Sequence, residues 1–253
     1  MSGTVRSFVD GPIGTIVIDN EARRNAMTLD MYAAVPDAVA AIATHSDVRV
    51  VVLRGAGDIA FGAGSDISEF PTQRTGDAAN HYNAVEAAAA RAVESIAVPV
   101  LALIHGACVG GGVGLALCAD VRYAADDAKF AVTPGKLGVG YPADSMARLA
   151  AIVGASRAKE LVFTARTIDA DEAERLGLVN AVVAKAKLDA YVADVAETIA
   201  ELAPLTLRAA KLAVADATSE LTAAAIARCY SSADYAEGIR AYFAKEAPRF
   251  EGR

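Results

Sequence analysis

The apolar residues of this chain fall into short runs and longer stretches that alternate along the sequence. The runs 48–53 and 98–104 are rich in Val, Leu and Ile and lead into glycine-containing loops, which predicts buried strands. The alanine-rich stretch 77–97 between them predicts a long helix. Because strands and helices alternate over the first two-thirds of the chain, the pattern predicts an α/β fold.

The two ends of the chain differ from this central pattern. The segments 5–9 and 15–18 predict a hairpin, and Thr28 is expected to cap a helix in which Pro36 removes a hydrogen bond or causes a kink. From residue 188 onward the pattern is almost entirely helical, with breaks expected at Pro204 and Gly238. We therefore predict a core over 1–187 and a C-terminal helical region over 188–253. Further strands are predicted at 121–124, 130–132 and 179–183, and further helices at 145–153, 156–164 and 170–176.

Three successive glycines, 110–112, follow the strand 98–104 and precede the apolar segment 113–117, which predicts the start of a helix. Glycine lets the backbone come very close to a ligand, and the N–H groups at a helix start have no partner within the helix. Such a place can stabilise negative charge. The alternative is that these glycines serve only tight helix packing.

Composition narrows the classes of partner. The net charge of −7 disfavours non-specific binding to nucleic acid or to an anionic membrane, and 54% hydrophobic residues suffice for a sizeable core and buried subunit contacts. Cys108, Cys118 and Cys229 have no metal-ligand spacing, so we expect no metal site and a reducing, cytoplasmic location. No signal pattern and no run of membrane length is recognised. His105 is expected to be a hydrogen-bonded core residue.

Two glycine-rich loops together carry a family resemblance. The segments 61–67 (Phe-Gly-Ala-Gly-Ser-Asp-Ile) and 106–112 (Gly-Ala-Cys-Val-Gly-Gly-Gly) resemble the paired signature of the crotonase superfamily, the enoyl-CoA hydratase/isomerase family. The resemblance extends over essentially the whole chain. It implies a spiral of ββα units with a C-terminal helical region, assembled as a homotrimer or a dimer of trimers. It also implies that acyl-CoA thioesters bind, with the N–H groups of Ser65 and Gly111 holding an enolate oxygen.

The resemblance further implies a set of residues that contact coenzyme A. Arg24 would meet a phosphate, and an aromatic residue and a lysine of the closing helix would reach the coenzyme A of a neighbouring site. For Arg24 and Lys245 an ordinary solvated surface charge is the alternative. Coenzyme A is here part of the substrate, and no separate cofactor is expected. The residues matched in this way are Arg24, Ala26, Ala63, Asp66, Ile67, Tyr242 and Lys245.

The sequence departs from the hydratase pattern at both positions where hydratases of this family carry a glutamate. These positions are Gly114 and Pro134, neither of which can transfer a proton. Tyr141 and Asp144 remain as candidate catalytic groups. Asp144 also suits a helix N-cap, and Tyr141 either lines an acyl pocket or, as the resemblance to methylmalonyl-CoA decarboxylases implies, contacts a substrate carboxylate.

Other nucleotide-binding and hydrolase motifs do not fit. The glycines 110–114 depart from the dinucleotide fingerprint, and 62–66 lacks the serine-hydrolase pattern. We therefore expect a lyase of the enoyl-CoA hydratase/isomerase family, acting in fatty acid metabolism, that stabilises a thioester enolate but lacks both hydratase glutamates. The alternatives are a methylmalonyl-CoA-type decarboxylase and a non-catalytic acyl-CoA binder. No nucleic acid or membrane partner is expected.

Overall fold

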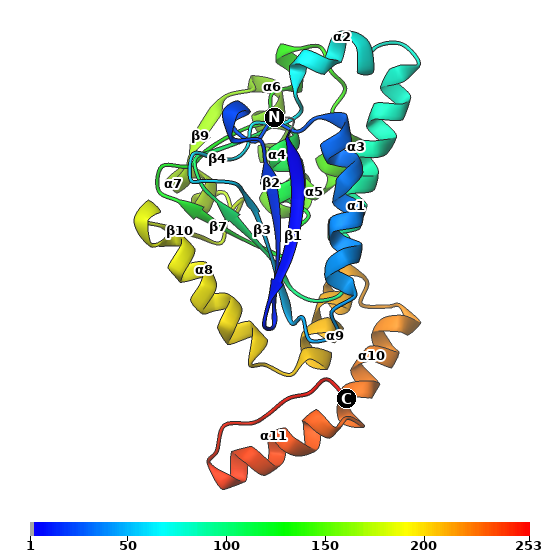
Figure 1. Cartoon of the computed structure of the whole chain (residues 1–253), viewed down its shortest axis with the longest axis vertical. Coiled ribbons are helices and arrows are strands. Elements are labelled where there is room, and N and C mark those ends of the chain that lie inside the picture. Colours follow the sequence, from blue (N-terminus) through cyan, green and yellow to red (C-terminus); the bar gives the residue numbers. More distant parts are fainter. Residues whose placement is uncertain (1–2) are drawn as a thin grey trace.

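Two sheets form the centre of the computed structural model, which describes residues 3–253 (Figure 1). The larger sheet has the strand order β1-β2-β3-β5-β7-β10, and the smaller has the order β4-β6-β8-β9. In the larger sheet only β1 runs antiparallel to its neighbour. The strands are β1 (Thr4–Asp10), β2 (Ile13–Asp19), β3 (Val50–Gly55), β4 (Ala60–Gly62), β5 (Val100–Ile104), β6 (Ala107–Val109), β7 (Val121–Ala125), β8 (Lys129–Ala131), β9 (Thr167–Asp169) and β10 (Ala181–Val183).

Successive pairs of strands contribute one member to each sheet before the chain continues into helices. The pairs β3–β4, β5–β6 and β7–β8 all behave in this way. This repeated arrangement confirms the predicted spiral of ββα units. The helices are α1 (Leu29–Ala43), α2 (Phe70–Gln73), α3 (Ala78–Glu94), α4 (Gly111–Ala116), α5 (Ala143–Val153), α6 (Ala155–Thr164), α7 (Ala170–Arg175), α8 (Lys185–Ala200), α9 (Pro204–Ala215), α10 (Glu220–Tyr230) and α11 (Ala233–Ala244), with short 3-10 helices at η1 (Glu21–Arg23), η2 (Ile67–Glu69) and η3 (Pro134–Lys136).

The smaller sheet places the two glycine-rich loops together. β4 pairs in parallel with β6, with Ala60 opposite Ala107 and Gly62 opposite Cys108. The carboxyl ends of parallel neighbours lie at the same sheet edge, so the loops that follow β4 and β6 leave the sheet side by side.

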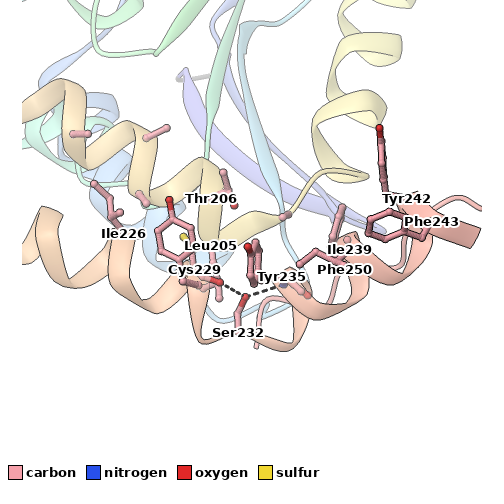
Figure 2. Close-up of a pocket in the computed structure, with 17 residues that line it drawn as sticks. Leu205, Thr206, Ile226, Cys229, Ser232, Tyr235, Ile239, Tyr242, Phe243 and Phe250 are labelled. Atoms are coloured by element: carbon pink, nitrogen blue, oxygen red, sulfur yellow. Dashed lines mark hydrogen bonds between the residues drawn. The ribbon is translucent and has the colours of Figure 1, made fainter. Parts of the chain in front are cut away.

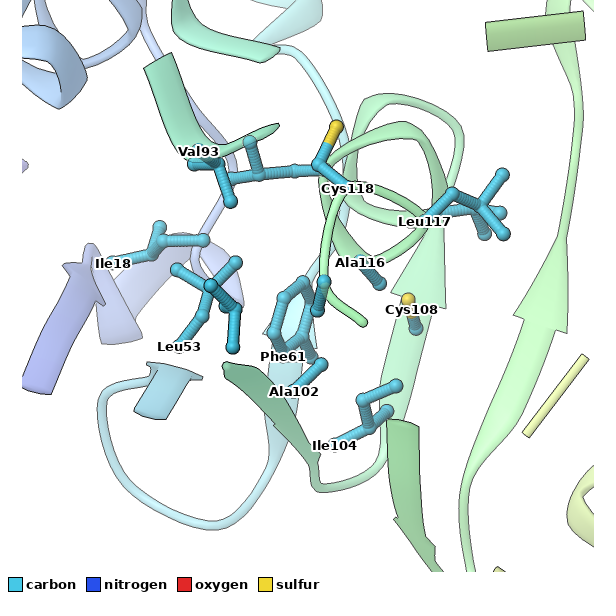
Figure 3. Close-up of a cluster of buried hydrophobic side chains, with 14 of the residues drawn as sticks. Ile18, Leu53, Phe61, Val93, Ala102, Ile104, Cys108, Ala116, Leu117 and Cys118 are labelled. Carbon is cyan, nitrogen blue, oxygen red and sulfur yellow. The ribbon is translucent and has the colours of Figure 1, made fainter. Parts of the chain in front are cut away.

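Apolar side chains fill both sides of the larger sheet. Phe61, Ile104 and Cys108 belong to the main cluster, in which the strands meet α3 and α4 (Figure 3). A second cluster joins strand residues such as Val50 to Leu188 of α8. The helix that begins the C-terminal region therefore packs against the sheet, and the predicted division at 187/188 stays a prediction. Among the described residues, no helix is both long and apolar enough to cross a membrane.

Most predicted elements are present, with a few differences. Thr28 caps α1, its Oγ1 accepting a hydrogen bond from the Met31 N–H at 3.2 Å, and Pro204 begins α9. The break expected at Gly238 is wrong, because Gly238 lies within α11. A Cβ atom there would lie 3.5 Å from the Phe250 ring, so this glycine makes room for the chain that returns along the helix.

The last three helices form an arm, residues 204–253, that extends from the end of the molecule opposite α2 (Figure 1). Lys211 of α9 attaches the arm to the core by donating to Asp120 at 2.7 Å and to the Val98 carbonyl at 3.2 Å. The chain after α11 folds back onto it, because the Asp234 carboxylate accepts hydrogen bonds from the N–H groups of Glu251 and Gly252. Figure 2 shows an apolar groove between these helices, which Leu205, Ile226, Tyr235, Ile239, Phe243 and Phe250 help to line.

Candidate active site

The loop after β4 is held by a short parallel bridge that leaves one N–H group pointing away from it. The Met27 N–H donates to the Gly64 carbonyl at 2.8 Å, and the Asp66 N–H donates to the Met27 carbonyl at 2.7 Å. In a parallel bridge of this kind, the flanking residues make the bonds, so the N–H of Ser65 faces the opposite side. Ser65 lines a cavity together with Gly110 and Gly111, which follow β6.

The backbone at Gly64 comes very close to the second loop. A Cβ atom on Gly64 would lie 2.9 Å from the Val109 carbonyl oxygen and 3.3 Å from the Gly111 nitrogen. Its φ of +94° is also a conformation that side chains disfavour. Glycine at position 64 therefore permits both the turn and the contact between the two loops.

Two further glycines fix the second loop. Gly110, with φ +54°, donates its N–H to the Ala131 carbonyl at 2.9 Å. A Cβ atom on Gly112 would lie 2.2 Å from the Gly62 carbonyl oxygen, which is far inside contact distance. Gly111 between them is the first residue of α4, so its N–H has no acceptor within the helix. The N–H groups of Ser65 and Gly111 thus belong to adjacent, tightly positioned backbones.

A buried asparagine fixes the segment before α1 against β4. Asn25 adopts a left-handed conformation, and its Oδ1 accepts a hydrogen bond from the Asn20 N–H at 2.9 Å. Its Nδ2 donates to the carbonyls of Ala56 and Ala60 at 2.9 and 2.7 Å. One amide therefore joins three segments beneath the candidate site.

A cluster of polar side chains lies beside the two loops, and we call Tyr32, Ser65, Arg74 and Glu86 the polar cluster. The Ser65 hydroxyl lies 3.1 Å from the Tyr32 hydroxyl and accepts a hydrogen bond from Arg74 at 3.3 Å. Arg74 also donates to Glu86 Oε2 at 2.8 Å. The Arg74 guanidinium lies over the ring of Tyr82 at 4.5 Å, which adds a cation–π contact.

Glu86 is the acidic member of this cluster and comes from the middle of α3. Only 14% of its side chain is exposed, and its Oε1 lies 3.6 Å from the point where a Cβ atom on Gly111 would be. Burial raises the pKa of Glu86, and the Arg74 charge and hydrogen bond only partly offset this. Burial, with the nearby Glu86 charge, also raises the pKa of Tyr32.

Tyr141 lines the same cavity as Ser65, Gly111 and Glu86. Its hydroxyl is buried and has no hydrogen-bond partner among residues 3–253. The hydroxyl lies 3.7 Å from the position of a Cβ atom on Gly114, so the two sequence positions do meet in space. Burial raises the pKa of Tyr141 well above its ordinary value.

Asp144 has a different place from the one predicted for a capping residue. Helix α5 begins at Ala143, and its N-cap position is Pro142, so Asp144 is the second residue of the helix and the capping hypothesis is wrong. Asp144 is exposed and lines a smaller adjoining cavity together with Glu86 and Arg148. It remains a candidate acid or base on the basis of position alone.

The residues matched to coenzyme A binding form two groups. Arg24, Ala26, Ala63, Asp66 and Ile67 belong to the segments that the Met27–Ser65 bridge joins. Arg24 and Ile67 are exposed, whereas the Asp66 carboxylate is engaged by Arg23 at 2.6 Å. Tyr242 and Lys245 lie on and just after α11, at the other end of the molecule (Figure 1). The chain by itself does not bring the two groups together.

Arg74 and Glu86 were not identified from the sequence. A signal for Glu86 was present in α3, where Tyr82, Glu86, Ala89 and Val93 recur at the spacing of one helix face. Three of these four residues are buried core residues, so a glutamate on the same face is unexpected if this face serves only to pack against the core.

His105 is a hydrogen-bonded core residue, as predicted. His105 is 3% exposed, and its Nε2 lies 2.6 Å from the Asp189 carboxylate of α8. Cys108 and Cys118 are buried in the core, and no cluster of His, Cys, Asp or Glu able to hold a metal ion occurs among residues 3–253. These residues therefore support the fold and lie outside the polar cluster.

Comparisons with known proteins match most or all of the chain. The family model described as enoyl-CoA hydratase/isomerase matches residues 10–253. A crotonyl-CoA hydratase from Syntrophomonas wolfei is 33% identical over 245 residues, covering 94% of each chain. A peroxisomal Delta(3,5)-Delta(2,4)-dienoyl-CoA isomerase from Arabidopsis thaliana is 33% identical over 219 residues, covering 82% of this chain and 78% of the relative.

Solved structures agree with these sequence relatives. The crystal structure of an enoyl-CoA hydratase/carnithine racemase from Magnetospirillum magneticum superimposes with a TM-score of 0.95 at 37% identity, covering 100% of this chain and 97% of the other. The crystal structure of an enoyl-CoA hydratase from Bacillus anthracis gives a TM-score of 0.90 at 30% identity over the full length of both. The loops, the fold and the comparisons agree, and the chain belongs to the enoyl-CoA hydratase/isomerase family.

Proposed function

We propose that this protein is an acyl-CoA enzyme that stabilises a thioester enolate on the backbone N–H groups of Ser65 and Gly111. The observation that carries the proposal is the contact between the two loops, which Gly64 permits and the Met27–Ser65 bridge orients. Donors fixed where negative charge develops lower the barrier because they need no reorganisation during the reaction. Each such donor is typically worth about 10²–10³ in rate.

The proposal assigns coenzyme A to the segments around the first loop. Arg24 is exposed at the turn before Ala26, where a phosphate can approach its guanidinium. Ala63 and Ile67 would line the nucleotide. Tyr242 and Lys245 would complete this site from a neighbouring subunit, in a homotrimer or a dimer of trimers.

The reaction is proposed to differ from two-carboxylate hydration. At position 114 the matched glutamate is replaced by a glycine, next to which the hydroxyls of Tyr141 and Ser145 lie. At position 134 a proline begins η3. Neither position supplies a carboxylate to activate water, so enolate formation rather than fast water addition is the activity proposed.

A second candidate is decarboxylation of a methylmalonyl-CoA-type thioester. The buried Tyr141 hydroxyl, which lacks a partner among residues 3–253, favours it because a substrate carboxylate could accept its hydrogen bond. Loss of CO₂ leaves the same enolate, so the two candidates share the backbone site.

The test is a screen of the purified protein with crotonyl-CoA and, separately, methylmalonyl-CoA, with thioester products followed by mass spectrometry. Tyr141→Phe and Asp144→Asn are run alongside. CO₂ loss that weakens in Tyr141→Phe supports the decarboxylase candidate. Fast hydration of crotonyl-CoA would contradict the inference from Gly114 and Pro134, and its loss in Asp144→Asn would identify the base. Binding of both thioesters without any turnover or α-proton exchange would identify a non-catalytic binder.

A further inference from the structure

The polar cluster contains a carboxylate that the proposed function has not used. Within the cavity that Ser65, Gly111 and Tyr141 line, Glu86 is the only carboxylate among the described residues. Its Oε2 is held by Arg74, whereas its Oε1 has no hydrogen-bond partner in residues 3–253. This second oxygen is the one that lies next to Gly111.

From this geometry we propose that Glu86 is the acid/base residue that moves a proton at the α-carbon of the bound thioester, an inference that rests on the proposed enolate site. A carbonyl oxygen bound to the Gly111 N–H places the α-carbon within about two bond lengths of that oxygen. The free Oε1 therefore faces the region in which the reacting carbon must lie. Glu86 reaches it from α3, which lies beside α4.

The chemical step balances without a further reactant. The Glu86 carboxylate takes a proton from the α-carbon, and the electron pair of the broken C–H bond becomes the enolate, with the negative charge on the thioester oxygen. In the reverse step the Glu86 carboxyl returns the proton to the carbon. In a decarboxylation the bond to CO₂ breaks instead, and the protonated carboxyl of Glu86 supplies the proton that replaces CO₂.

Arg74 is assigned a positioning role. It fixes one oxygen of Glu86, it also donates to Ser65, and it is itself held against the Tyr82 ring. Only 7% of the Arg74 side chain is exposed, so the pair is largely screened from water. The opposite effects of burial and of the Arg74 charge leave the carboxyl with a raised pKa, which makes it a stronger base than an exposed glutamate.

The alternative groups are less suited to the role. The Tyr141 hydroxyl has a pKa raised by burial, so it holds its proton near neutral pH. Asp144 is exposed to water and lines only the adjoining cavity. Glu86 combines burial, an orienting partner and a free oxygen beside Gly111.

The test is exchange of the α-protons of butyryl-CoA for deuterium in D₂O, measured by mass spectrometry, with binding of butyryl-CoA measured by calorimetry. We expect Glu86→Gln to slow exchange by about 10²–10⁴ while the Kd changes little. Glu94→Gln, the same substitution two turns further along α3, is the matched control and should exchange at the rate of the unmodified protein.

The outcomes separate the two proposals. If the unmodified protein binds butyryl-CoA but exchanges none of its α-protons, the enolate site fails. If exchange is present and Glu86→Gln retains it, the enolate site stands and the role of Glu86 is wrong. If Glu86→Gln does not fold, the double variant Arg74→Gln/Glu86→Gln removes both buried charges, and rapid exchange in that variant would overturn the role.

A pH profile distinguishes positioning by Arg74 from mere structural support. Exchange should rise with pH through the pKa of Glu86, which lies above the ordinary value of about 4.3. Removing Arg74 raises this pKa further, so Arg74→Gln should move the acid limb of the profile to higher pH, and Arg74→Lys should move it less. An equal loss of rate at every pH, with no shift of the limb, would contradict the assignment.

Discussion

The polar cluster and the C-terminal arm differ in whether their side chains find partners within the same chain. Arg74 and Glu86 are nearly buried, and each holds a partner within the same chain. On the arm, by contrast, large apolar side chains such as Val214, Tyr242 and Phe243 are 79–90% exposed. The charged side chains of the polar cluster are therefore paired within one chain, whereas the arm has an apolar surface that nothing in residues 3–253 covers.

This difference indicates what each region needs from outside. The buried ion pair beside the positioned N–H groups has its partners within one chain. An exposed apolar surface of this kind is typical of a contact between proteins. The predicted assembly of three copies, or of two sets of three, would cover the arm and would bring Tyr242 and Lys245 to a neighbouring site.

The largest expected effect comes from the backbone contact beneath the candidate site. In Gly112→Ala the new Cβ atom would lie 2.2 Å from the Gly62 carbonyl oxygen, so the two loops must separate. We expect a loss of about 1–3 kcal/mol in the free energy of unfolding and loss of α-proton exchange. Chemical denaturation and the exchange assay measure both.

Gly114→Ala is the matched control in the same helix. Its Cβ atom would lie 3.4 Å from the Ser145 hydroxyl, which can move slightly, and alanine favours the helix. This variant should be as stable as the unmodified protein. Equal destabilisation of the two variants would show that the Gly62–Gly112 contact does not fix the loops.

An intermediate effect is expected on the arm. Phe243→Glu puts a charge on the apolar groove, so we expect self-association to weaken by at least about tenfold, measured by sedimentation velocity. Phe163→Glu on α6, where the side chain is equally exposed at 79%, is the control and should leave the assembly intact. If both variants keep the same oligomeric state, the arm is not the contact surface.

The smallest effect is expected at Lys245, which ends α11 in a left-handed conformation with φ 58°. Lys245→Gly relieves about 1–2 kcal/mol of backbone strain in the folded state. The added flexibility of glycine stabilises the unfolded state by about 0.4–1 kcal/mol, so the free energy of unfolding should rise by about 0.5 kcal/mol. Lys245→Ala keeps the strain and should show no gain in thermal denaturation. Both should weaken acyl-CoA binding equally if the ammonium group contacts a phosphate, and unchanged binding in both would remove Lys245 from the site.

The sequence predicted the fold well where one local pattern decides an element. The runs that become β3 and β5 are rich in Val and Leu. Thr28 carries a hydroxyl that can accept the hydrogen bond of a helix N-cap. The three-residue strands β4, β6 and β9 were not predicted, and pairing with neighbouring strands defines them.

The candidate site was predictable only in part. Its two glycine-rich loops carry the family resemblance, and the resemblance made Ser65 and Gly111 candidates before the structure was known. Arg74 and Glu86 are twelve residues apart, at the end of α2 and in α3, and they meet because these two helices pack together. Asp144 was misplaced as a possible cap because the helix starts two residues earlier than the predicted helix 145–153.

The use of backbone N–H groups in the loop contact has a consequence for how this activity can change over time. Every residue except proline carries the same backbone N–H, so no single substitution at Ser65 other than proline removes this donor. Side chains around the cavity, such as those at positions 86, 114 and 141, can be exchanged while the N–H groups proposed to stabilise the anion stay in place. The site can thus pass between reactions through intermediates that still hold an enolate, which makes new activities accessible one mutation at a time.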